Sequence, residues 1–142
     1  MVKVAVLDYG IGNLRSAQKA FEISGAEARL TADKDLVLAS DGVVLPGVGN
    51  FGKCAKALTD SGVRELALLA VENGIPFLGI CVGMQLLYET SDESPAAQGL
   101  GLFSGKVKML ENAPRVPQMQ WNQIQLKDDS PLLRGLEGEW FY

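Results

Sequence analysis

Cys81 lies between two glycines in the stretch GICVG at positions 79–83. The stretch follows the apolar run IPFLG and precedes MQLLYET, so the pattern predicts a strand that turns into a helix at the cysteine. A sharp strand-to-helix turn exposes a nucleophile, and flanking glycines let the neighbouring backbone pack closely around it. The N-terminus of the following helix favours the thiolate, the reactive form of cysteine. The pattern favours a catalytic cysteine, with a buried structural cysteine as the alternative.

A second turn, PGVG at positions 46–49, ends an earlier apolar run. In a parallel sheet the carboxyl ends of the strands meet at one edge, and ligands gather there. We therefore expect the PGVG turn and Cys81 to share that edge. The glycines of this turn and the N–H of Val82 could then stabilise an oxyanion on a substrate carbonyl. The alternative is an ordinary turn that ends a strand.

Two other stretches carry weaker signals. Cys54 lies in the helix-like FGKCAKAL without a sharp turn, which indicates a small core residue. The stretch YGIGN at positions 9–13 follows the first apolar run, but Arg15 stands where a dinucleotide-binding motif has its third glycine. We therefore expect no dinucleotide at this turn, and the sequence indicates neither a cofactor nor a metal site.

Composition narrows the class of protein. The chain has 142 residues, of which 47% are hydrophobic and 21% charged, and its net charge is −4. These values suit one α/β domain with its own core, and the lack of a basic block argues against nucleic acid as a partner. The apolar runs are too short to span a bilayer. Two cysteines without a CxxC spacing indicate reduced thiols and a cytoplasmic protein.

Strands and helices are expected to alternate up to residue 90, which predicts a mainly parallel sheet covered on both faces. The expected strands are 2–8, 27–32, 42–47 and 75–80, and the expected helices are 13–24, 34–40, 51–62, 63–74 and 82–90, with a polar loop at 91–101. From 104–110 onward the pattern changes, and the segments at 115–126 and 139–142 predict strands without intervening helices, hence an antiparallel extension or an added layer. We expect residues 1–142 to form a single domain, incomplete at its C-terminus because EWFY stops within a strand.

Together these stretches resemble class I, or triad-type, glutamine amidotransferases over the whole chain. GICVGMQLLYE (79–89) and LPGVGNFG (45–52) match the class, whereas VLDYGIGNLRS (6–16) and PQMQWN (117–122) are similar to one branch, the amidotransferase subunits of imidazole glycerol phosphate synthase. The resemblance implies a flavodoxin-like three-layer sandwich. It also implies hydrolysis of L-glutamine, with the released ammonia passed to a partner.

The resemblance gives each matched residue a role in this reaction. These are Cys81 as the nucleophile, Val48, Gly49 and Val82 in the oxyanion hole, and Gln85 and Glu93 in binding the substrate. Glu93 falls where the branch has an acidic residue near the substrate's amino group. Without the resemblance, it reads as part of a solvated loop.

The implied partner is the (β/α)8-barrel cyclase subunit of imidazole glycerol phosphate synthase, in histidine biosynthesis. Asn13, Trp121 and Asn122 would lie near this partner. Asn13 is more simply an N-cap, and Trp121 could equally be a core tryptophan in a strand. Gln120 stands where the family has glycine, which puts coupling to the cyclase in doubt.

The sequence departs from the family in having no histidine. The family's catalytic histidine, and the glutamate that orients it, lie beyond a strand that EWFY resembles. We interpret the chain as a fragment of a longer protein rather than a dead enzyme, and expect the 142 residues alone to be inactive. The alternatives are a glutaminase of another pathway, such as vitamin B6 synthesis, and a non-catalytic partner-binding subunit.

Overall fold

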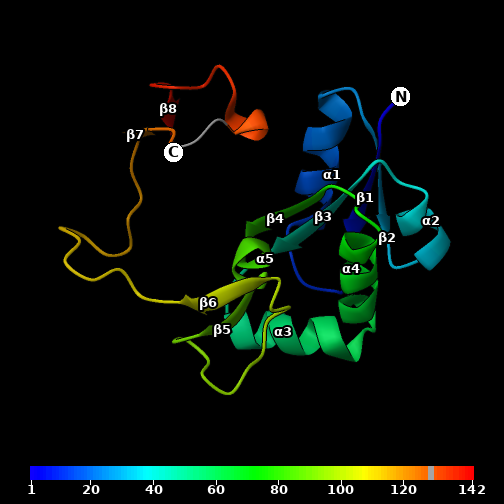
Figure 1. Ribbon diagram of the computed structural model, residues 1–142, viewed down its shortest axis with the longest axis horizontal. Helices are drawn as coiled ribbons and strands as arrows, with labels where there is room; N and C mark the ends of the chain where they lie inside the picture. Colours follow the sequence, from blue (N-terminus) through cyan, green and yellow to red (C-terminus); the bar gives the residue numbers. More distant parts are fainter. Residues whose placement is uncertain (128–129) are drawn as a thin grey trace. The chain divides into compact units, whose positions relative to one another are not determined.

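The structure is a computed structural model that describes residues 1–127 and 130–142 (Figure 1). The chain forms two compact units, residues 1–109 and 110–142, and each is described by itself. The expectation that residues 1–142 form a single domain, incomplete at its C-terminus, stays a prediction. No helix in the described part of the chain is long and apolar enough to cross a membrane.

The first unit is built on a parallel sheet of four strands in the order β2-β1-β3-β4. These strands are β1 (Lys3–Leu7), β2 (Glu27–Thr31), β3 (Gly42–Gly47) and β4 (Phe77–Cys81). Each predicted strand is confirmed to within about two residues of its ends. Both β1 and β3 are almost entirely buried, because helices cover the two faces of the sheet. This order is the one found in flavodoxin-like folds.

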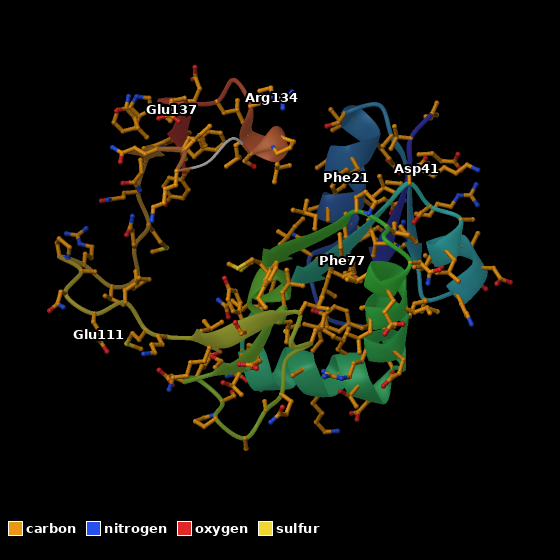
Figure 2. All side chains as sticks on the ribbon, in the orientation of Figure 1. Phe21, Asp41, Phe77, Glu111, Arg134 and Glu137 are labelled. Atoms are coloured by element: carbon orange, nitrogen blue, oxygen red, sulfur yellow. The ribbon has the colours of Figure 1, made fainter. Side chains whose placement is uncertain are left out.

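The helices divide between the two faces of this sheet (Figure 1). They are α1 (Leu14–Ile23), α2 (Lys34–Leu38), α3 (Phe51–Asp60), α4 (Val63–Glu72) and α5 (Val82–Gln85). Because side chains alternate along a strand, Val4 and Val6 face α1, where Phe21 packs on them. Ala5 and Leu7 face the opposite way, into the core formed with α3 and α4. Figure 2 labels Phe21, and also Phe77 of β4, which packs against that second core.

The helix expected at 82–90 is wrong beyond Gln85. The chain instead forms β5 (Tyr88–Ser91), which pairs in parallel with β6 (Phe103–Val107). A distant segment takes the carbonyl groups that a longer helix would have used. The Leu100 N–H donates to the Leu86 carbonyl at 2.6 Å, and the Phe103 N–H donates to the Leu87 carbonyl at 3.0 Å. The change of pattern expected from 104–110 thus coincides with β6, whose pairing is parallel rather than the antiparallel pairing expected there.

The second unit contains little regular structure. Its strands are β7 (Asn122–Gln123) and β8 (Trp140–Phe141), which pair antiparallel, and Pro131–Leu133 form a single 3-10 turn. The antiparallel pairing was expected, but the strand predicted over 115–126 is confined to two residues. Every described residue in this unit is exposed or half-buried, so the alternating pattern has no core to face.

Candidate functional site

Cys81 occupies the sharp turn between β4 and α5. Its backbone has φ 56° and ψ −119°, a positive φ that non-glycine residues rarely adopt. Strain of this kind is typical of a nucleophile held between a strand and a helix. The thiol is free and the residue is exposed, so the buried structural cysteine considered as an alternative is wrong.

The glycines near Cys81 allow α5 to lie directly on the ends of β3 and β4. A Cβ at Gly83 would overlap the Leu45 carbonyl group, and one at Gly79 would lie 2.5 Å from the Met84 Cα. A Cβ at Gly47 would lie 2.6 Å from the Gly83 nitrogen. Side chains therefore have no room where these backbones meet, which confirms the steric reason for glycine in this motif.

The helix that follows Cys81 is shorter than expected. It spans only Val82–Gln85, so the dipole expected from a helix over 82–90 is reduced to that of a single turn. The Val82 side chain is buried in the core, whereas Cys81 at the start of the turn is exposed. The N–H groups of this single turn therefore replace the longer helix as the favourable dipoles near the sulfur.

The PGVG turn lies at the same sheet edge as Cys81, as predicted. Gly47 is paired with Cys81 in the register of β3 and β4. The next residue, Val48, is 47% exposed, and Gly49 has φ 82°, which glycine adopts without strain. Two stretches far apart in the sequence thus bring a thiol and an exposed loop backbone to one rim of the sheet.

Two buried side chains donate hydrogen bonds to carbonyl groups of the PGVG turn. The Tyr9 hydroxyl donates a hydrogen bond to the Pro46 carbonyl at 2.7 Å, and the Cys54 thiol donates to the Val48 carbonyl at 3.2 Å. Cys54 is fully buried, as predicted for a core residue, but it also makes this polar contact. The hydrogen bond from Tyr9 to Pro46 was not predicted from the sequence. The position of Tyr9 directly after the first strand is the single feature of the sequence that indicates it. Burial raises the pKa of Tyr9 well above its ordinary value, and the adjacent Cys54 raises it further.

The raised pKa of Tyr9 predicts a loss of stability at alkaline pH. Folded Tyr9 keeps a proton that the unfolded chain releases above about pH 10, so the free energy of unfolding should fall as pH rises past that value. The expected slope is at most about 1.4 kcal/mol per pH unit. Urea unfolding of the complete protein and of Tyr9→Phe, between about pH 9 and pH 11, measures it. An equal pH dependence in both proteins would contradict the prediction.

Gln85 and Glu93 lie on segments that flank Cys81 and the PGVG turn. Gln85 is half-buried at the end of α5. Glu93 is exposed, but its Oε2 accepts a hydrogen bond of 2.7 Å from the Phe51 N–H at the start of α3. The Ser94 hydroxyl accepts a similar bond from the Gly52 N–H at 3.2 Å. The loop expected to be merely solvated is therefore attached to the helix that follows the PGVG turn.

The three residues expected near a partner are accessible to different degrees. Asn13 is at the N-cap position of α1 and exposed, but its side chain makes no capping hydrogen bond, so only its place was predicted correctly. In the second unit, Trp121 is 63% exposed and packs against Tyr142 with ring centroids 5.7 Å apart. It precedes β7, so the alternative of a core tryptophan in a strand is wrong. The half-buried Asn122 side chain accepts a hydrogen bond from the Gln120 side chain.

The fold and the cysteine turn together define a class of protein. The chain belongs to the class-I glutamine amidotransferase family, whose model matches residues 5–140. A crystal structure of a glutamine amidotransferase has a similar fold, with a TM-score of 0.62 and 24% sequence identity, over 74% of this chain and 55% of that one.

Two relatives are described as imidazole glycerol phosphate synthase subunit HisH. The relative from Methanothermobacter thermautotrophicus is 47% identical over 98% of this chain and 69% of its own length. The relative from Pyrococcus furiosus is 43% identical over 100% of this chain and 70% of its own length. The similarity to these subunits therefore extends through both units of the chain.

Proposed function

We propose that this chain belongs to the glutaminase subunit of an imidazole glycerol phosphate synthase. It hydrolyses L-glutamine to glutamate and supplies ammonia to a cyclase subunit in histidine biosynthesis. The observation that carries the proposal is the strained, exposed Cys81, whose partner in the sheet register is Gly47 of the PGVG turn. The HisH relatives, at 47% and 43% identity, support the choice of pathway.

In the proposed reaction the Cys81 thiolate attacks the carbon of the glutamine side-chain amide. The carbonyl oxygen becomes an oxyanion, which accepts hydrogen bonds from the backbone N–H groups of Val48, Gly49 and Val82. The C–N bond then breaks and, after gaining a proton, the nitrogen leaves as ammonia, with a thioester left on Cys81. Water attacks the thioester, which releases glutamate and returns the thiol.

The proposed reaction needs a base that takes the thiol proton and gives it to the leaving nitrogen. The chain contains no histidine, so we propose that the histidine and the glutamate of a Cys-His-Glu triad come from outside these 142 residues. Gln85 and Glu93 bind the glutamine. One Glu93 oxygen is already hydrogen-bonded to the Phe51 N–H, and the other can accept from the ammonium group of the substrate.

The proposed partner is a (β/α)8-barrel cyclase, with Asn13, Trp121 and Asn122 in or near the interface. Exposure of Asn13 and Trp121 supports this assignment. Gln120 hydrogen-bonds to Asn122, so its side chain occupies part of the same surface.

Coupled assays test the proposal. We expect the protein from the complete reading frame, mixed with the cyclase, to support synthesis of imidazole glycerol phosphate with glutamine as the nitrogen source. If a vitamin B6 synthase, and not the cyclase, stimulated glutamine hydrolysis by this protein, the protein would belong to that pathway instead. Binding to the cyclase without glutamate release would indicate a non-catalytic subunit.

A further inference from the structure

The carbonyl groups of the PGVG turn are held by side chains from two separate elements. Tyr9 follows β1, and its hydroxyl donates to the Pro46 carbonyl at 2.7 Å. Cys54 lies in α3, and its thiol donates to the Val48 carbonyl at 3.2 Å. Both side chains are buried in the same core cluster, on the face of the sheet that α3 covers. The turn is therefore fixed to the core at two of its four carbonyl groups.

Holding a carbonyl group also orients the N–H group of the same peptide. The carbonyl and N–H of a trans peptide are coplanar and point in opposite directions. Because the Val48 carbonyl points at the buried Cys54 thiol, the N–H of Gly49 must point away from it. Val48 and Gly49 are exposed, whereas Gly47 is buried, so the turn emerges from the core at this peptide.

We propose that Tyr9 and Cys54 are positioning residues for the Gly49 N–H in the oxyanion hole, an inference that rests on the proposed glutaminase function. Cys54 orients this N–H directly, through the Val48 carbonyl of the same peptide, whereas Tyr9 acts indirectly, by fixing the start of the turn at the Pro46 carbonyl. Neither side chain touches the substrate. Each acts through the peptide planes of the PGVG turn, so that the N–H groups are oriented before the substrate arrives. Preorganised donors of this kind stabilise the transition state without reorganising during the reaction.

Two features distinguish this role from simple core packing. Phenylalanine and alanine would leave most of the apolar contacts of Tyr9 and Cys54, but neither can donate to a carbonyl. The spacing around Gly47 is also close, since a Cβ there would lie 3.1 Å from the Tyr9 hydroxyl oxygen.

Steady-state glutamine hydrolysis by the complete protein with its cyclase tests the inference. In Tyr9→Phe and in Cys54→Ala we expect kcat to fall at least about 10-fold, approaching the roughly 100-fold loss that follows removal of an oxyanion donor. KM for glutamine should change little, because the turn acts mainly on the transition state. Cys54→Ser keeps a donor at the same place and should recover most of the lost rate.

A second measurement separates positioning from damage to the fold. Iodoacetamide alkylates Cys81 by displacement at a saturated carbon, which forms no oxyanion, so its rate should be the same in the variants and in the wild type. Thr59→Val is the matched control. It removes a hydroxyl that donates to the Ala55 carbonyl in the same helix, away from the PGVG turn, and should leave kcat unchanged.

Each other result has a distinct meaning. Unchanged kcat in Tyr9→Phe and Cys54→Ala, with an active wild type, would overturn the positioning role and leave the proposed function intact. A parallel fall in kcat and in the alkylation rate would also overturn it, because the defect would lie in the fold or in Cys81 itself. A wild-type complex that hydrolyses no glutamine would refute the proposed function, and this inference with it.

Discussion

Replacing Cys81 by alanine should abolish glutamine-dependent synthesis by the complex, with a loss on the order of 10⁴-fold or more. The proposed reaction passes through a thioester on this sulfur, and within these 142 residues the other cysteine, Cys54, is fully buried and cannot replace it. Alanine keeps the Cβ and the strained backbone, so the turn itself should persist. Glutamate release, measured with saturating glutamine, gives the size of the effect.

Ammonia-dependent synthesis provides the control for this variant. In the proposed scheme the cyclase consumes ammonia, so ammonia added to the solution should replace glutamine as the nitrogen source, and the Cys81→Ala complex should retain that activity. Loss of both activities would mean that Cys81 supports the structure or the association of the subunits. Retention of glutamine-dependent activity would remove the basis of the proposed mechanism.

Gly83→Ala should give the largest loss of stability. The new Cβ would overlap the Leu45 carbonyl group, which belongs to the backbone of a central strand and cannot rotate away. Overpacking of this kind should lower the free energy of unfolding by about 3 kcal/mol or more. Urea unfolding of the complete protein, followed by circular dichroism, measures the difference.

Gly42→Ala is the matched control for Gly83→Ala. Gly42 begins β3, the strand that contains Leu45. A Cβ at Gly42 would lie 3.7 Å from the Pro76 carbonyl oxygen, an ordinary contact distance. This variant should unfold within about 1 kcal/mol of the wild type. Equal stabilities of the Gly83 and Gly42 variants would show that α5 can move off β3 at little cost.

The four parallel strands and the turn at Cys81 could be predicted because their signals are local. Short apolar runs close to glycine or proline marked three of the four strands, and glycines on either side of the cysteine marked the turn. Chain order along a parallel sheet then placed the PGVG turn beside Cys81, and the register between Gly47 and Cys81 agrees.

The errors have long-range causes. MQLLYET has the composition of a helix, but the Leu86 and Leu87 carbonyls bond to residues 100 and 103, which a local pattern cannot show. The strand predicted at 115–126 has the right alternation but no buried face to stabilise it. The contact between Tyr9 and Pro46 joins residues 37 positions apart, and neither residue type signals such a bond.

The hydrogen bond between Glu93 and Phe51 complicates the interpretation of substrate affinity. Phe51 begins α3 two residues after Gly49. A ligand that binds the Glu93 carboxylate therefore also changes the strength of the hydrogen bond between Glu93 and the Phe51 N–H at the start of this helix. In the proposed mechanism, binding of the substrate's ammonium group at Glu93 and alignment of the oxyanion donors are therefore energetically linked. Substitutions at Glu93 will therefore alter turnover as well as Michaelis constants, and a double-mutant cycle with Tyr9 is needed to separate the two.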